Sequence, residues 1–139
     1  MSEQNRFFTN DSPELTPVIG LGAGGHAKVV IEILQTLGSY NVVGLLDSNQ
    51  ELWNTQVLSI PVLGDDDLLP ELLNSGVQTA FIGLGGTGDT QPRRRLFEYA
   101  IAAGFQAVEV IHPRAVVSPS AELGIGATVM AGAIINSEA

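Results

Sequence analysis

The sequence of 139 residues has no cysteine and little positive charge. Without cysteine there is no disulfide, no thiolate metal site and no cysteine nucleophile, which fits a cytoplasmic protein. Six lysine and arginine residues stand against 15 aspartate and glutamate residues, so the formal net charge is -9. This charge repels phosphate backbones and anionic lipid surfaces, so the sequence predicts neither a nucleic acid nor a membrane as a partner.

The sequence also lacks the long apolar runs of exported and membrane proteins. Its first 17 residues do not show the basic and then apolar order of a signal peptide. No run approaches the roughly 20 apolar residues that cross a bilayer. Hydrophobic residues still make up 45% of the chain and charged residues only 15%, which is enough for a folded core. We expect a cytoplasmic domain with an appendage, preceded by a flexible lead-in over residues 1–16.

Between residues 17 and 110, short strands alternate with helices. We predict buried strands over residues 17–21, 41–46, 79–84 and 107–111, an extended piece over 57–63, and helices over 26–37, 65 to about 74 and 92 to about 103. This alternation is typical of an α/β fold with a parallel sheet and helices on both faces.

The C-terminal segment, residues 111–139, follows a six-residue period instead. Every sixth position is aliphatic, at Ile111, Val117, Leu123, Val129 and Ile135, and a second register is always alanine, at Ala115, Ala121, Ala127, Ala133 and Ala139. Such a period indicates hexapeptide blocks of a parallel β-helix. With three blocks to a coil, the segment holds fewer than two coils. No capping element follows, so we expect residue 139 to be an artificial or proteolytic end.

Glycines follow the first predicted strand in a pattern that suits phosphate binding. Two overlapping patterns, Gly20 to Gly25 and Gly22 to Ala27, match the glycine fingerprint of dinucleotide-binding folds. Glycines there let backbone N–H groups approach a pyrophosphate at a helix N-terminus. Asp47, just past the second strand, stands where an acidic residue holds a ribose or base. The alternative is a tight turn that binds no ligand.

Four further positions are candidates for the same crevice. His26, in the first turn of the helix, could donate to a phosphate or a sugar hydroxyl, or only bond to neighbouring backbone. Gly85 and Gly86 follow the strand expected beside the first one, and in open parallel sheets ligands bind outside the carboxyl ends of strands. Arg93 could reach a phosphate, although we expect at least two of the three adjacent arginines to be solvated. His112 has no partner suggested by sequence, so we interpret it as structural.

Three strings together carry a family resemblance. The string GAGGHAKVV at residues 22–30, GLLD at 44–47, and Ile111-His112-Pro113 before the six-residue blocks resemble the PglD/NeuD-type sugar acetyltransferases. The resemblance covers roughly residues 17–139. It implies a Rossmann-like domain over 17–110 that binds a UDP-linked amino sugar, followed over 111–139 by the truncated start of a left-handed β-helix. The intact protein would be a homotrimeric acetyltransferase with acetyl-CoA as co-substrate.

The resemblance also implies roles for individual residues. Gly22, Ala23, Gly24, Gly25 and His26 would line the diphosphate and sugar side of the pocket, Asp47 and Ser48 would contact the uridine, and Gly85, Gly86 and Arg93 would close the far wall. The catalytic histidine and the acetyl-CoA cleft belong to later coils, so we expect this chain to bind but not to catalyse, and to hold no metal or cofactor. The sequence separates neither N- from O-acetylation nor one sugar acceptor from another.

Two alternatives stay open. An NAD-binding Rossmann module of an oxidoreductase or redox sensor would account for the segment from Gly22 to Asp47, but not for the six-residue period. A non-enzymatic interaction module would make both features structural. Binding of uridine nucleotides, of NAD or of neither distinguishes the three interpretations.

Overall fold

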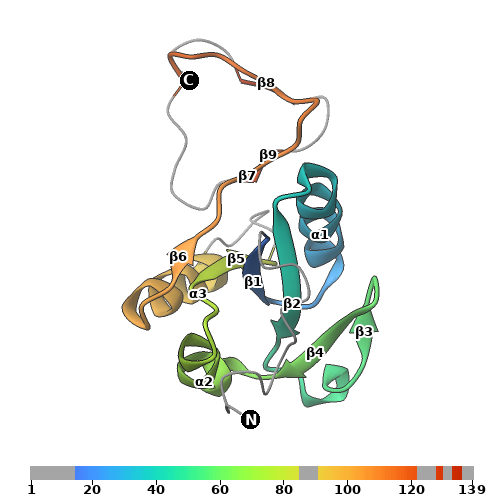
Figure 1. The fold of residues 1–139 in the computed structure, drawn as a ribbon, viewed down its shortest axis with the longest axis vertical. Helices are drawn as coiled ribbons and strands as arrows, with labels where there is room; N and C mark the ends of the chain where they lie inside the picture. The colour runs from blue at the N-terminus through green and yellow to red at the C-terminus, as the bar shows by residue number, and fades with distance from the viewer. Residues whose placement is uncertain (1–14, 85–90, 122–127, 130–132, 136–139) are drawn as a thin grey trace.

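A computed structural model of the protein describes residues 15–84, 91–121, 128–129 and 133–135. Its centre is a six-stranded sheet in the order β3-β4-β2-β1-β5-β6 (Figure 1). The strands are β1 (Thr16–Leu21), β2 (Tyr40–Leu46), β3 (Gln56–Val57), β4 (Ile60–Gly64), β5 (Thr79–Ile82) and β6 (Gln106–Ala107). All neighbouring pairs are parallel except β3 with β4. The predicted α/β class with a mostly parallel sheet is confirmed.

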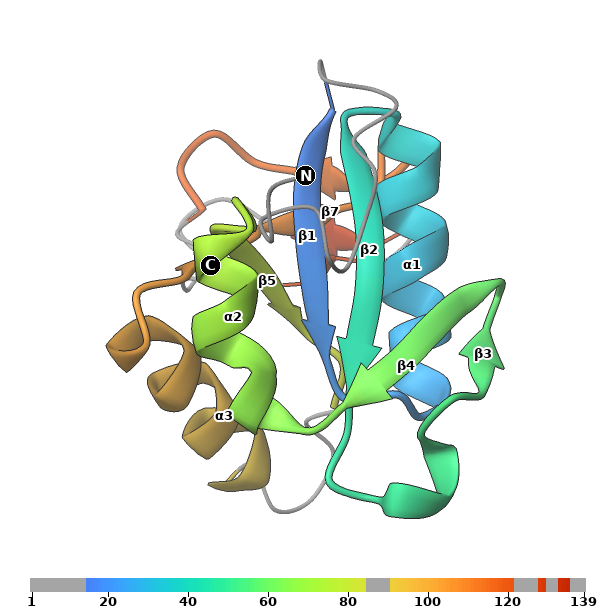
Figure 2. The ribbon, with the colours of Figure 1, turned by 60° about the horizontal axis from the view of Figure 1, so that its bottom comes forward.

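Helices cover both faces of this sheet. Helix α1 (Gly25–Leu37) lies on one face, and α2 (Leu69–Asn74) and α3 (Gln91–Ala102) lie on the other (Figure 2). Successive residues of β1 point to opposite faces, as a strand requires. Val18 packs in a buried cluster with residues of α1, whereas Ile19 packs in a second cluster with residues of α2 and α3. No described helix has the length and apolar character needed to cross a bilayer.

The structure differs from the prediction between β2 and β5. Two 3-10 turns, Gln50–Leu52 and Asp66–Leu68, precede β3 and α2 respectively. The extended piece at 57–63 is in fact a hairpin, because the chain reverses between β3 and β4. Its turn residues Leu58 and Ser59 both have positive φ, 50° and 69°. Glycine and asparagine are the usual residues in such turns, so the sequence carried no signal for this one.

The predicted strand at 107–111 divides between the two parts of the fold. Its first residue ends β6 in the main sheet, while β7 (Val110–Ile111) pairs in parallel with β9 (Thr128–Val129). Likewise β8 (Val116–Val117) pairs in parallel with β10 (Ile134–Ile135). Both partners lie eighteen residues further along, which is three six-residue blocks, so the chain closes one coil of a parallel β-helix.

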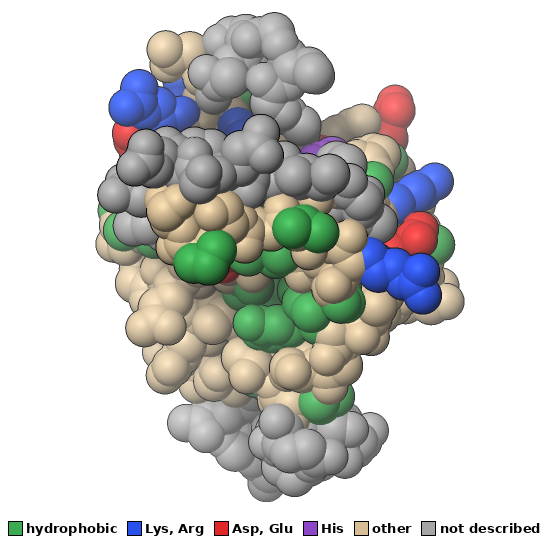
Figure 3. Space-filling view, turned by 90° about the horizontal axis from the view of Figure 1, so that it is seen from above, with side chains coloured by type: hydrophobic (Ala, Val, Ile, Leu, Met, Phe, Trp, Pro, Cys, Tyr) green, Lys and Arg blue, Asp and Glu red, His purple; other side chains and the backbone are tan. Residues whose placement is uncertain are grey.

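Figure 3 looks onto this coil from above and shows hydrophobic side chains gathered at the centre of the face, with charged side chains toward its edges. Most of the predicted lead-in, residues 1–14, lies outside the described residues, as do Leu123, Ala127 and Ala139 of the repeating positions.

Candidate functional site

The site is built around a close approach of backbone between the ends of β1 and β5. The N–H of Gly83 donates to the carbonyl of Leu21 at 2.6 Å, and the N–H of Gly22 donates to the carbonyl of Leu46 at 2.7 Å. Gly22 has φ of 108°, which favours glycine. A Cβ on Gly83 would lie only 2.6 Å from the carbonyl oxygen of Gly22. Two glycines therefore bring β1 and β5 together where the strand order reverses, the usual ligand position in such sheets.

The N-terminus of α1 lies open beside this approach. Gly24 and Gly25 are exposed, and a Cβ on either would meet no atom of the described residues within 4 Å. Gly24 is the N-cap of α1, without a side-chain hydrogen bond and without an acidic residue in the first turn. Ala27, two residues into the helix, is fully buried and faces Gly83. Of the two glycine patterns, the one from Gly22 to Ala27 thus matches the fingerprint. Among the described residues nothing covers the helix N-terminus, which suits an anion.

Asp47 ties three neighbouring segments to the glycine loop. Its Oδ2 accepts the N–H of Ala23 at 3.0 Å, and its Oδ1 accepts the N–H of Asn49 at 2.8 Å. Its own N–H donates to the carbonyl of Gly64, and its carbonyl accepts the indole N–H of Trp53, both at 2.8 Å. Asp47 stands at the predicted position after β2, and its carboxylate holds the loop in shape.

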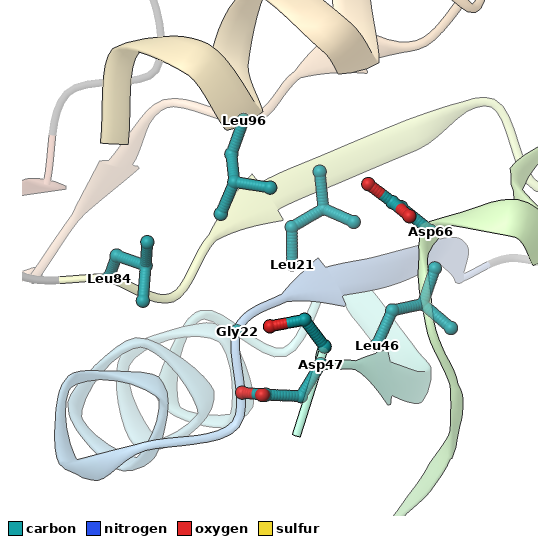
Figure 4. Close-up of a pocket in the computed structure, with 8 residues that line it drawn as sticks. Leu21, Gly22, Leu46, Asp47, Asp66, Leu84 and Leu96 are labelled. Carbon is teal, nitrogen blue, oxygen red and sulfur yellow. The ribbon is translucent and has the colours of Figure 1, made fainter. Parts of the chain in front are cut away.

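A pocket opens where these strands end (Figure 4). It is lined by Leu21, Gly22, Leu46, Asp47, Ser48, Asp66, Leu84 and Leu96. Its volume is about 420 Å³, counted together with the solvent at its mouth. Apolar walls with a few polar groups are typical of small-molecule sites. Four leucines form the walls here, and the carboxylates of Asp47 and Asp66 with the hydroxyl of Ser48 supply the polar groups.

Arg93 gives the other side of the site its positive charge. From the first turn of α3, its Nη1 donates to the carbonyl of Leu84 at 2.7 Å and to that of Ile82 at 3.3 Å. The side chain predicted to reach a phosphate is therefore bound to the end of β5. Burial, and secondly the charge of Arg93, lower the pKa of His26. His26 is thus favoured as a neutral imidazole at the N-terminus of α1.

The structure brings most of the predicted residues together at one edge of the sheet. Gly22 to His26 form the loop and helix start, and Asp47 and Ser48 follow β2 beside them. Gly85 and Gly86 lie outside the described residues. His112, interpreted as structural, accepts the N–H of Arg114 through its Nδ1 at 3.0 Å, within a turn of the coil.

Sequence reasoning missed Asp66 and the pocket leucines. Asp66 belongs to the run Asp65-Asp66-Asp67, which the sequence indicated only as a helix start. In the structure Asp65 does cap this turn, since its Oδ1 accepts the N–H of Asp67 at 3.0 Å, whereas Asp66 lines the pocket. Ligand atoms of the three carboxylates lie within 4.8 Å of one another, which follows from their positions in one turn. No sequence signal distinguished the carboxylate that lines the pocket.

Comparison with protein families and solved structures gave consistent matches. The family model of the PglD N-terminal domain matches residues 18–100. Perosamine N-acetyltransferase from Caulobacter crescentus, solved in complex with CoA and GDP-perosamine, is 44% identical, with a TM-score of 0.78 over 88% of this chain and 55% of that one. The acetyltransferase domain of PglB from Neisseria gonorrhoeae, in complex with acetyl coenzyme A, is 35% identical, with a TM-score of 0.69 over 86% of this chain and 55% of that one.

A more distant match shares the fold alone. UDP-D-quinovosamine 4-dehydrogenase from Vibrio fischeri is 13% identical, with a TM-score of 0.57 over 66% of this chain and 75% of that one. A search of curated proteins found no match. The chain thus spans about half the length of these two acetyltransferase structures. The alternative of an NAD-binding oxidoreductase module is not favoured.

Proposed function

The chain belongs to the family of PglD N-terminal domains, and we propose that it binds the nucleotide part of a nucleotide-linked amino sugar, the acceptor that the intact protein acetylates. The observation that carries this proposal is the open space over Gly24 and Gly25 at an uncapped helix N-terminus. Side chains at these positions would fill space that a diphosphate needs. A purely structural turn has no need of a glycine where a Cβ meets nothing.

The charges around the site orient such a nucleotide. The N-terminus of α1, together with Arg93, attracts a diphosphate. The Asp47 carboxylate is bonded to the glycine loop through the N–H of Ala23. Asp66, on the pocket wall after β4, repels phosphates but can accept hydrogen bonds from a nucleoside. We therefore assign Gly22 to His26 to the diphosphate and sugar, and Asp47 and Ser48 to the nucleoside. Because Arg93 is bound to backbone carbonyls, it acts on the diphosphate through its charge, while Gly85 and Gly86 are assigned to the far wall.

The proposal extends to the intact protein. Residues 17–110 form the nucleotide-sugar domain, and residues 111–139 form the first hexapeptide blocks of a left-handed β-helix that assembles as a homotrimer in the cytoplasm. Acetyl-CoA donates the acetyl group in a cleft between subunits, where a histidine on later coils is the general base. The coil of eighteen residues supports this proposal, as do the relatives solved with CoA or acetyl-CoA. The family resemblance predicts uracil as the base of this nucleotide.

Isothermal titration of this chain with UDP, GDP and NAD tests the proposal. We expect saturable binding of at least one nucleoside diphosphate and none of NAD. Gly24→Ala places a methyl group in the open space, and we expect it to weaken that binding by at least about tenfold while the chain stays folded. The matched control is Gln35→Ala, on the exposed far end of α1, with unchanged affinity. Binding of NAD without any nucleoside diphosphate would instead support the oxidoreductase alternative.

A further inference from the structure

Asp66 lines the pocket, but the proposed function does not assign it a contact with the ligand. It lies two residues after the end of β4, and its carboxylate points toward Leu21 on the pocket wall (Figure 4). Within the described part of the chain, no hydrogen bond or ion pair engages this carboxylate. In contrast, both oxygens of Asp47 already accept backbone N–H groups. Asp66 is therefore the pocket carboxylate with both oxygens available to a ligand within the described residues.

The bound nucleotide must place its base at this end of the pocket. A diphosphate is repelled by the Asp66 carboxylate and drawn to the N-terminus of α1, where His26 and Arg93 lie. The base then reaches the opposite end, where Leu46 and Leu96 offer apolar faces to an aromatic ring. A carboxylate only accepts hydrogen bonds, so the base edge that meets Asp66 has to donate.

Among the common bases, guanine presents the edge that suits a carboxylate best. Its N1–H and its exocyclic N2 amino group are adjacent parallel donors, which match the two carboxylate oxygens as an arginine fork does. In uracil the single N3–H lies between two carbonyl oxygens, which a carboxylate repels. In adenine the amino group lies beside a ring nitrogen that is itself an acceptor.

We propose that Asp66 selects guanine, so that the acceptor of this protein is a GDP-linked sugar. This inference rests on the proposed function, because it presumes a nucleotide in the pocket. It replaces the uracil expected from the family resemblance. It also assigns base specificity to a residue after β4, outside the glycine loop.

Titration of the chain with GDP, UDP and inosine diphosphate tests the inference directly. Inosine diphosphate differs from GDP only in lacking the N2 amino group. We expect GDP to bind at least about tenfold more tightly than UDP and about tenfold more tightly than inosine diphosphate, the usual discrimination of a bidentate contact. Asp66→Asn places an amide donor against a guanine donor, so the ratio of GDP to inosine diphosphate affinity should fall to about one. Asp67→Asn, at an exposed neighbour outside the pocket, is the matched control and should keep the ratio.

The outcomes separate this inference from the proposed function. Nucleoside diphosphates that bind without a preference for GDP would overturn the role of Asp66 and leave the nucleotide-binding proposal intact. The same holds if Asp66→Asn keeps the preference for GDP over inosine diphosphate. A folded chain that binds none of the three nucleotides would overturn both. Should Asp66→Asn not fold, the ratio of GDP to inosine diphosphate affinity in the unaltered chain alone decides.

Discussion

The α/β region and the C-terminal coil are held together in different ways. In the α/β region, β1 has a parallel partner on each side, and buried clusters pack on both faces of the sheet. In the coil, each described strand has two residues and one partner eighteen residues away. Val129 is buried there, but Val116 is 61% exposed. The first region thus contains its own core. In the coil, as in other repeat structures, each unit is stabilised mainly by contacts with the units stacked next to it.

The two regions meet at β7. Val108, between β6 and β7, and Val110 belong to the same buried cluster as residues of α1. The first strand of the coil is therefore anchored on the α/β core, and β9 pairs with it, whereas β8 and β10 pair with each other. This gives a graded expectation, in which substitutions have smaller effects on global unfolding the further they lie from the sheet.

The largest effect is expected in the sheet itself. Phe81 on β5 is 1% exposed, and its ring occupies the space that Gly20 leaves by lacking a Cβ. We expect Phe81→Ala to lower the free energy of unfolding by about 3–5 kcal/mol, because it leaves a cavity in a packed core. Val116→Ala in the coil is the control and should change it by less than about 0.5 kcal/mol. Similar values from chemical denaturation would contradict the comparison between the two regions.

A smaller effect is expected where β1 and β5 approach each other. Gly83→Ala places a Cβ against the carbonyl oxygen of Gly22, and backbone has to shift to admit it. We expect a loss of about 1–3 kcal/mol, the scale of overpacking. Gly25→Ala is the matched control, because a Cβ there meets nothing and alanine favours a helix. Equal denaturation midpoints for the two variants would show that the glycines at the strand ends are not sterically required.

This contrast also explains what the sequence could reveal. Hydrophobic periodicity located β1, β2, β5, α1 and α3 within a few residues, because each places apolar side chains against a core at a fixed spacing. The parallel pairing of β7 with β9 spans eighteen residues, which is three of the six-residue blocks read from the sequence. A helix, strand or coil that buries one face spaces its apolar residues regularly in the sequence, so its position can be predicted.

The rest depended on contacts that leave no such pattern. The hairpin at Leu58 and Ser59 uses positive φ at residues that ordinarily avoid it, so the surrounding packing decides the turn. The glycine loop was predicted from spacing, but the opposition of Gly83 to Gly22 is a contact between distant segments. Asp66 lines the pocket because of the way β4 ends beside β2, and a sequence shows three equivalent aspartates at that point.

Within the coil, we expect a local effect. Val129 pairs with Ile111 of β7 and is 5% exposed. Val129→Ala should lower the free energy of global unfolding by at most about 1 kcal/mol, since burial of two methyl groups is lost in a region that opens separately. Hydrogen exchange should show faster exchange of coil amides around β7 and β9 and unchanged protection of β1 and β2. Faster exchange in β1 and β2 as well would mean that coil and sheet unfold as one unit.

The smallest effect is expected at His26, and it depends on pH. Burial and the charge of Arg93 place the pKa of His26 below its ordinary value of 6.5. The unfolded chain therefore binds more protons at this residue than the folded chain, so stability that is present above pH 6.5 is lost as the pH falls toward the lower, folded value.

Replacing the imidazole with an uncharged side chain removes this contribution. Between about pH 7.5 and about pH 5.5, denaturation midpoints of the unaltered chain should fall more than those of His26→Gln, while carboxylates contribute equally to both. A bound diphosphate should reverse the sign, because its negative charge favours the protonated ring, so nucleotide affinity should rise as the pH falls. The contradicting result is that His26→Gln leaves the pH dependence of the denaturation midpoint unchanged, with and without nucleotide. Neither Arg93 nor the ligand would then act on this histidine. The α/β region would also lack the charge asymmetry on which the proposed nucleotide orientation depends.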